Sequence, residues 1–190
     1  MTTDKPNMIR FPPPRSATRG RLKIETDCFV ALDFETADYG QDSACSIALI
    51  RVENHAIVHR EHRLIRTPRQ GFTFSYLHGI TWQQVAREPA FPELWPQIMP
   101  LLEGARFIAA HNASFDANVM RACCAAAALP PPQPPYLCTV KLARRTWNIR
   151  PTKLPDVCQH LGLTLKHHDA LSDAEACANI VLAAIREGAL

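Results

Sequence analysis

Apolar and polar residues alternate along residues 30–36, where apolar side chains at every second position are separated by Ala31, Asp33 and Glu35. A period of two is that of a β-strand, so the pattern predicts a strand with Asp33 and Glu35 on the same face. Two neighbouring carboxylates repel each other and lose hydration on burial. A divalent cation between them would offset both costs, because hard oxygen ligands suit Mg²⁺ or Mn²⁺.

Hydrophobic periodicity predicts the remaining elements of the chain in the same way. Strands are predicted at 45–52, 56–65, 106–110 and 136–138, and the first two form an antiparallel meander with the strand that begins near Cys28. Helices are predicted at 81–87 and 91–102, from the end of strand 106–110 to about 129, and at 139–147, 154–161 and 170–186. Strands come first and then alternate with helices, which predicts an α/β protein with a mixed sheet.

The composition is that of an ordinary globular protein, since 47% of the 190 residues are apolar and 21% are charged. No apolar run approaches the roughly 18 residues needed to cross a bilayer, and residues 1–15 lack the apolar segment of a secretory signal. The seven cysteines form no Cys-x-x-Cys pair, so we expect reduced, largely buried packing residues. These features predict a cytoplasmic protein without membrane contact.

Positive charge is concentrated at the N-terminus. Residues 1–26 hold six basic and two acidic residues, whereas the whole chain has a net charge of +3. We therefore predict a basic, flexible N-terminal arm over 1–26 and a folded domain over 27–190. The arm either contacts a polyanion or is simply solvated.

Three further residues have the side chains of a catalytic site. Asp116 lies at the junction between strand 106–110 and the following helix, and His168 precedes Asp173 by five residues. Each acid alone also suits the first turn of a helix, where the macrodipole favours a negative charge by about 0.3–1 kcal/mol. Asp169 is the candidate N-cap of the last helix, whose helical period turns Glu175 away from Asp173.

Four stretches carry a resemblance to a known family. They are Leu-Asp-Phe-Glu-Thr at 32–36, His-Gly-Ile-Thr at 78–81, Ala-His-Asn-Ala-Ser-Phe-Asp at 110–116 and His-Asp-Ala-Leu-Ser-Asp-Ala at 168–174. In this order and spacing they resemble the motifs of the DEDDh exonucleases. That family includes the proofreading epsilon subunit of bacterial replicative polymerases, RNase T and oligoribonuclease. The resemblance covers roughly residues 27–187.

The resemblance implies an RNase H-like fold, a five-stranded mixed β-sheet flanked by α-helices. It implies a metal-dependent 3′→5′ exonuclease, a phosphodiester hydrolase that releases nucleoside 5′-monophosphates from mainly single-stranded DNA or RNA. Two Mg²⁺ or Mn²⁺ ions, which suit this hydrolysis, would be held by four acids, and a histidine would be the general base. The residues that match these roles are Asp33, Glu35, Asp116 and Asp173 for the metals and His168 for the base.

Substrate contacts are predicted at Thr36 and His78, which match positions where the family contacts the terminal nucleotide. Phe115 either packs against a base or its sugar, or packs in the core of its helix; the same alternatives hold for Phe34. Basic residues at 141, 144 and 145 have the i, i+3, i+4 spacing of one helix face, which either neutralises phosphates or is solvated.

Two other functions remain open at this point. One is a non-catalytic nucleic-acid-binding module on the same fold, although all five catalytic positions are filled. The other is a proofreading subunit that acts with a DNA polymerase. Because the chain ends at Leu190, soon after the last predicted helix and without a long extension for docking, we expect a stand-alone enzyme. The choice between DNA and RNA and the oligomeric state are left open.

Overall fold

A five-stranded mixed sheet forms the centre of the protein, whose computed structural model describes residues 28–190. The predicted arm over 1–26 lies outside the described residues. The strands lie in the order β3-β2-β1-β4-β5. The first three pair antiparallel, and β4 and β5 pair parallel to β1. Their bounds are Cys28–Thr36 (β1), Ala44–Glu53 (β2), Ala56–Leu64 (β3), Ile108–Ala110 (β4) and Tyr136–Cys138 (β5).

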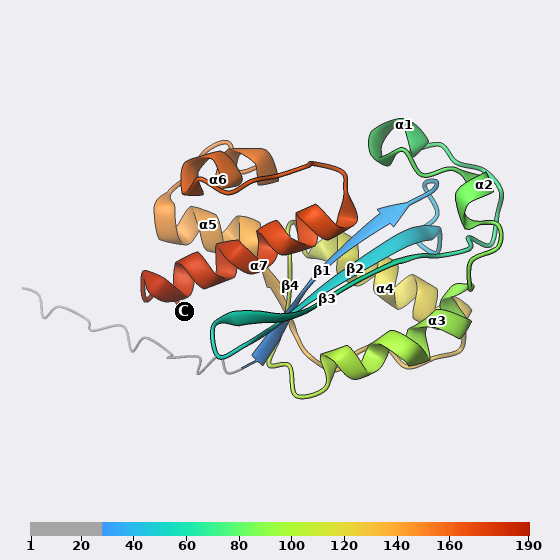
Figure 1. Cartoon of the computed structure of the whole chain (residues 1–190), viewed down its shortest axis with the longest axis horizontal. Coiled ribbons are helices and arrows are strands. Elements are labelled where there is room, and N and C mark those ends of the chain that lie inside the picture. The colour runs from blue at the N-terminus through green and yellow to red at the C-terminus, as the bar shows by residue number, and fades with distance from the viewer. Residues whose placement is uncertain (1–27) are drawn as a thin grey trace, which may run out of the picture.

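Helices cover both faces of this sheet (Figure 1). Helices α5, α6 and α7 pack on one face, and α3 and α4 pack on the other. The helices are α1 (Ser75–His78), α2 (Trp82–Val85), α3 (Phe91–Ile98), α4 (Ser114–Ala126), α5 (Thr139–Trp147), α6 (Leu154–Leu161) and α7 (Ala170–Arg186), with a 3₁₀ helix η1 (Met99–Leu102) after α3. This is the predicted α/β architecture, and the meander over 28–65 is confirmed.

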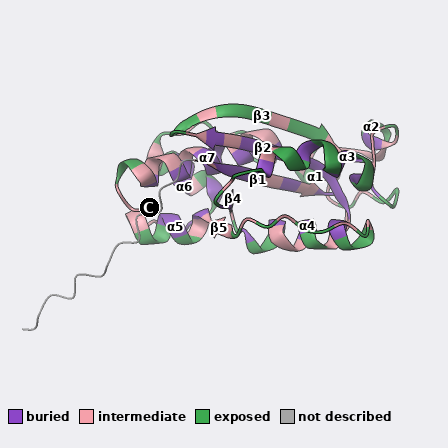
Figure 2. Ribbon diagram, turned by 90° about the horizontal axis from the view of Figure 1, so that it is seen from below, coloured by how far each residue is buried: buried purple, intermediate pink, exposed green. Residues whose placement is uncertain are grey.

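Strand β1 is buried on both faces, as its buried colour in Figure 2 shows. Phe29 and Ala31 face the core formed with α7, whereas Val30 and Leu32 face the core formed with α3 and α4. The alternation continues beyond these residues, so the side chains of the following odd-numbered positions point toward α7. The predicted common face of the two carboxylates is therefore the face that α7 covers.

The predicted helix over 91–102 is wrong over its last four residues. Helix α3 ends at Ile98, and the chain continues as the 3₁₀ helix η1. Pro100 explains the change, because proline has no N–H to donate to the carbonyl four residues earlier and its ring clashes with that carbonyl. Helix α1 was not predicted, since a helix of four residues is too short to show a period of 3.6.

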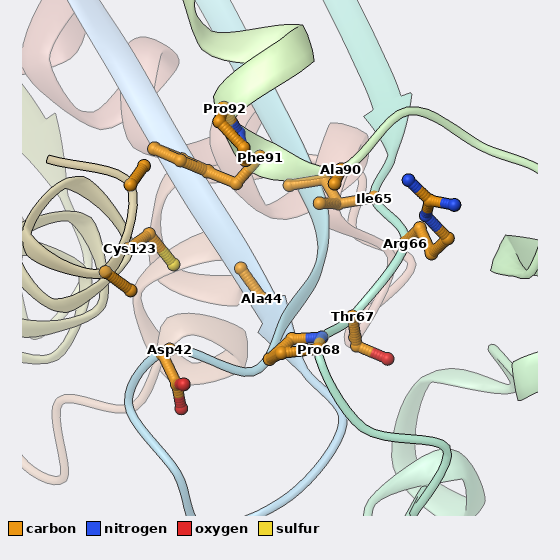
Figure 3. Close-up of a pocket in the computed structure, with 12 residues that line it drawn as sticks. Asp42, Ala44, Ile65, Arg66, Thr67, Pro68, Ala90, Phe91, Pro92 and Cys123 are labelled. Atoms are coloured by element: carbon orange, nitrogen blue, oxygen red, sulfur yellow. The ribbon is translucent and has the colours of Figure 1, made fainter. Parts of the chain in front are cut away.

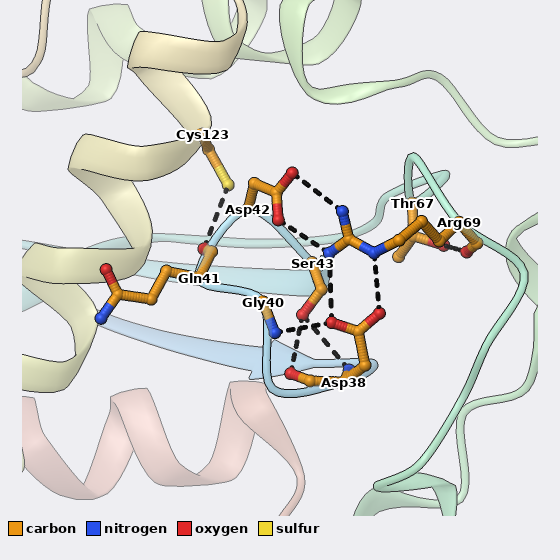
Figure 4. A network of polar contacts seen from close by, with 8 residues as sticks. All are labelled: Asp38, Gly40, Gln41, Asp42, Ser43, Thr67, Arg69 and Cys123. Atoms are coloured by element: carbon orange, nitrogen blue, oxygen red, sulfur yellow. Dashed lines mark hydrogen bonds and ion pairs between the residues drawn. The ribbon is translucent and has the colours of Figure 1, made fainter.

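The turn that follows β1 is fastened to the loop after β3 by Arg69 (Figure 4). The Arg69 guanidinium donates to Asp38 Oδ2 at 3.0 Å and to Asp42 Oδ1 at 2.7 Å. These hydrogen bonds lower the pKa of both carboxyl groups. A Cβ atom at Gly40 would lie closer than 3.0 Å to both carboxylates and to Arg69, so a larger residue there would displace the side chains of this clamp. The clamp holds the end of the strand that carries the candidate site.

Candidate active site

The four predicted acids converge at the end of β1. One carboxylate oxygen from each of Asp33, Glu35 and Asp173 lies within 4.8 Å of the others. Asp116, in the first turn of α4, accepts a hydrogen bond from the Phe34 N–H through Oδ1 at 3.2 Å. That bond places the Asp116 carboxylate against the backbone between the two acids of β1. Residues that are far apart in sequence therefore form one carboxylate cluster.

His168 lies beside Asp173 at the start of α7. The His168 N–H donates to Asp173 Oδ2 at 3.1 Å, and Asp169 caps the helix by accepting from the Ser172 N–H at 3.1 Å. His168 has a φ of +66°, a left-handed conformation that residues other than glycine rarely adopt. The chain thus turns sharply just before the N-cap and brings the imidazole back toward the acid.

His167 is a site residue that sequence analysis missed. Its Nδ1 lies 3.0 Å from Asp173 Oδ2, and its ring stacks on that of His168 with centroids 3.9 Å apart. The two histidines and Asp173 also form a group with ligand atoms within 4.8 Å of one another. The only signal in the sequence is its position beside His168, since nothing in a motif distinguishes a histidine that supports an acid from a solvated one.

Burial raises the pKa of all four carboxyl groups. Loss of water is the largest cause in each case, and it raises the pKa of Glu35 to about 7 and of Asp116 to about 8. The pKa of Asp33 lies well above its ordinary value, because burial is reinforced by Asp116, Asp173 and Glu35. The pKa of Asp173 is also raised by burial, against hydrogen bonds from the two histidines that lower it. A cluster of this kind holds its full negative charge only beside compensating positive charge.

The donor set fits divalent cations. Every carboxylate offers hard oxygen ligands, which Mg²⁺ and Mn²⁺ prefer. Asp173 Oδ1 is buried and has no hydrogen-bond partner among residues 28–190, so a lone pair is left for a ligand that the protein chain does not supply. Asp116 is 1% exposed and Asp173 is 4% exposed, which makes the absence of a positive partner costly.

The three predicted substrate contacts lie in different environments. His78 Nε2 donates to the Thr36 carbonyl oxygen at 3.2 Å, and its Nδ1 accepts from the Ile80 N–H at 3.0 Å. Burial lowers the pKa of His78, in keeping with a neutral ring that fastens the loop after α1 to the end of β1. Phe115 is 44% exposed and therefore not a core residue, whereas Phe34 is 3% exposed and is one.

Two open pockets meet at the carboxylates. One, of about 430 Å³, is lined by Glu35, His78 and His168. The other, of about 600 Å³, is lined by Asp33 and Asp173 together with residues of α5 and of the loop before α6. A separate pocket of about 340 Å³, shown in Figure 3, lies between the start of α3 and α4 and contains none of the predicted site residues.

The three basic residues of α5 do not line one pocket. Arg144 lines the 600 Å³ pocket that contains two of the acids. Lys141 and Arg145 line a different pocket, of about 510 Å³, beside the edge strand β5. The three residues therefore do not form the common face that their spacing predicts. Arg144 lies on the side of the helix nearer the acids, and the other two line the pocket beside β5.

Comparison with protein families and known sequences gives a consistent result. The family described as "Exonuclease" (RNase_T) matches residues 30–181. A DNA polymerase III PolC-type from Thermotoga petrophila is 32% identical over 163 residues, which are 84% of this chain and 12% of that protein. The 3′-5′ exonuclease DinG of Bacillus subtilis is 30% identical over 160 residues, which are 81% of this chain and 17% of that protein. The chain thus spans a small part of the relatives it matches.

Solved structures share the fold. Exonuclease X in complex with 5′ overhanging duplex DNA has a TM-score of 0.71 and 27% identity, and the match covers 85% of this chain and 93% of that one. The nuclease domain of 3′hExo, a DEDDh family member bound to rAMP, has a TM-score of 0.75 and 19% identity, and the match covers 87% and 94%. The sheet is thus the RNase H-like sheet expected from the motifs. Within residues 28–190, none of the helices has the length and apolar character to span a membrane.

Proposed function

Because the chain belongs to the exonuclease (RNase_T) family, we propose that it is a metal-dependent 3′→5′ exonuclease. It hydrolyses phosphodiester bonds at the 3′ end of mainly single-stranded nucleic acid and releases nucleoside 5′-monophosphates. The observation that carries the proposal is the convergence of four carboxylates, two of them buried and two partly buried, beside one imidazole. No common structural role explains why acids from β1, α4 and α7 share one site at a cost in hydration.

Four acids hold the cofactor in this proposal. Asp33, Glu35, Asp116 and Asp173 would bind two divalent cations, Mg²⁺ or Mn²⁺, and the free lone pair of Asp173 Oδ1 supports this. When bound, such cations supply Lewis acidity and stabilise negative charge on phosphate oxygens. The chain itself contributes a fixed frame, since the Phe34 N–H orients Asp116 and the His168 N–H orients Asp173.

His168 is the proposed general base. Partial burial and the neighbouring His167 lower its pKa, so the imidazole is neutral at pH 7 and able to accept the proton of the attacking water at a ring nitrogen. It lines the same pocket as Glu35 and His78. We assign the 3′-terminal nucleotide to that pocket, with contacts to Thr36 and His78 and with the exposed Phe115 ring available to a base or sugar.

A test needs an oligonucleotide labelled at its 5′ end, Mg²⁺ or Mn²⁺, and EDTA. We expect a ladder of products shortened from the 3′ end, release of mononucleotides, and complete loss of both with EDTA. Asp116→Asn and His168→Ala should each lower the rate by about 100-fold or more. Glu175→Gln is the matched control, because Glu175 lies on α7 but pairs with Arg60 at 2.8 Å on the surface. Binding without cleavage would instead identify a non-catalytic module.

A second candidate is a proofreading subunit that acts with a DNA polymerase. The similarity to PolC-type polymerases favours it, although the chain matches only 12% of the T. petrophila protein. Co-purification of a polymerase with the tagged chain would support this function. Structural relatives hold DNA in one case and rAMP in another, so matched DNA and RNA oligonucleotides are the substrates to compare. The cytoplasmic location stays a prediction.

A further inference from the structure

We propose that Arg144, together with Lys153, binds the phosphate that lies one nucleotide upstream of the bond being cleaved. This inference rests on the proposed exonuclease function, and it adds a second binding site for the substrate strand. The site is the 600 Å³ pocket on the far side of the carboxylates from His78. The strand would then run from the pocket of the 3′-terminal nucleotide, across the acids, to the guanidinium group.

The lining of this pocket carries both signs of charge. Asp33 and Asp173 line it from β1 and α7, and Arg144 and Lys153 line it from α5 and the loop before α6. A ligand that fills the pocket must therefore carry one group that binds the metal ions held by the acids and a second, anionic group for the basic residues. Consecutive phosphates of a nucleic acid have this arrangement, whereas a single nucleotide has an anion for the acidic end only. The pocket volume also lies within the range of about 300–1,000 Å³ that ligand sites occupy.

A chain of hydrogen bonds holds Arg144 in place. Its Nε donates to Thr152 Oγ1 at 2.9 Å, and the Thr152 carbonyl accepts from His111 Nε2 at 3.0 Å. His111 Nδ1 lies 2.9 Å from Thr139 Oγ1, which is fully buried at the start of α5. The imidazole thus joins the end of β4 to the loop before α6, and that loop in turn fixes the arginine. His111 is a positioning residue in this arrangement.

The terminal nitrogens of Arg144 are available to a ligand. Among residues 28–190, the only hydrogen bond that the Arg144 side chain donates is the one from Nε. Nη1 and Nη2 form a planar pair of donors that matches two oxygens of a phosphate. Lys153 lines the same pocket, and within residues 28–190 its hydrogen bonds involve only its backbone, whose N–H donates to Asp156 at 2.9 Å. Lysine adds charge without fixing orientation.

The neighbouring residues of the same helix give a matched control. Lys141 is three positions from Arg144 and is also exposed, yet it lines the pocket beside β5, which contains none of the four acids. General attraction between nucleic acid and a basic helix would involve both residues alike. A specific upstream phosphate site involves Arg144 and leaves Lys141 without a role.

Two dinucleotides separate these possibilities. Thymidylyl-thymidine with a 5′-phosphate (pTpT) carries the upstream phosphate, and TpT lacks it, while the cleaved bond is the same. For the wild type, we expect kcat/KM to be about 10- to 100-fold higher for pTpT than for TpT, as for a hydrogen bond to a charged group. In Arg144→Ala this ratio should fall several-fold, with Lys153 supplying what remains, and in Lys141→Ala it should equal the wild-type ratio. An Arg144 that only supports the loop would lower both rates and leave the ratio intact.

An unchanged ratio in Arg144→Ala, or a wild-type ratio near 1, would overturn the inference. If the wild type cleaves neither dinucleotide nor any longer oligonucleotide, the proposed function itself fails. The phosphate site is then still testable by the salt dependence of binding to 5′-phosphorylated oligothymidylate. Loss of one phosphate contact should reduce the slope of log K against log salt by about 0.7 in Arg144→Ala, the value for a single strand, and an equal slope in both proteins would refute the site.

Discussion

Neutralising one buried acid should stabilise the metal-free protein while it removes activity, and Asp116→Asn is the substitution of choice. Asn has the shape of Asp and keeps an Oδ1 atom to accept the hydrogen bond from the Phe34 N–H, which is 3.2 Å long. The substitution therefore changes the charge of a side chain that is 1% exposed and little else. In the absence of cations, that charge is a cost to the folded state.

The size of the effect follows from the pKa of the Asp116 carboxyl group, which burial raises from 3.8 to about 8. Between these two values the folded protein binds more protons than the unfolded chain, so the free energy of unfolding falls as the pH rises. Each pKa unit corresponds to about 1.4 kcal/mol, which sets an upper limit of roughly 4 kcal/mol at pH 7. Relaxation and water penetration reduce such costs, so we expect about 1–3 kcal/mol.

Thermal unfolding in EDTA at pH 5 and pH 8 measures this difference. For a chain of this length, each kcal/mol shifts the Tm by about 2–4 °C. We expect Asp116→Asn to have a higher Tm than the wild type at pH 8 and a smaller advantage at pH 5, which lies closer to the ordinary carboxyl pKa of 3.8, where the difference begins. Saturating Mg²⁺ should raise the Tm of the wild type more than that of the variant. An equal or lower Tm of the variant at pH 8 would refute the electrostatic reasoning.

Three other substitutions test separate parts of the site. For the wild type, the rate should rise with pH and reach a plateau once His168 is neutral. Because the pKa of His168 is lowered from 6.5, the midpoint of this rise should lie below that value. A similar rise in His168→Ala would exclude His168 as the base. His167→Ala removes the contact to Asp173 Oδ2 at 3.0 Å and should raise the Mg²⁺ concentration for half-maximal rate about tenfold; an unchanged Mg²⁺ requirement would show that His167 has no such role. Gly40→Ala places a Cβ within 3.0 Å of the side chains of the Arg69 clamp and should lower the free energy of unfolding by about 1–3 kcal/mol. Gly71→Ala is the control and should leave this free energy unchanged, because no atom lies within 4 Å of the added Cβ. Equal effects of the two substitutions in urea unfolding would contradict the role of the clamp.

Features set by a local period or a motif could be predicted from the sequence. The common face of Asp33 and Glu35 follows from the period of a strand. The N-cap role of Asp169 follows from side-chain chemistry at a helix start, and its hydrogen bond confirms it. The identity of the acids as a set came from the order of four motifs rather than from any one residue.

Features set by contacts between distant segments could not be predicted. The bond between Asp116 and the Phe34 N–H joins residues 82 positions apart, and no spacing encodes it. The partner of His167 and the separation of Arg144 from Lys141 depend in the same way on how α5 and α7 lie against the sheet. The break of α3 at Ile98 was visible in Pro100, but helical spacing of the apolar residues outweighed it in the prediction.

Anomalous diffraction from crystals soaked in Mn²⁺ would locate the cations without relying on activity. We predict strong anomalous peaks enclosed by the carboxylates of Asp33, Glu35, Asp116 and Asp173, with the buried Asp173 Oδ1 as a ligand. Loss of those peaks in Asp116→Asn would support the same conclusion. Saturating Mn²⁺ that gives no peak among the four carboxylates would contradict the proposal that they form the metal site of a nuclease.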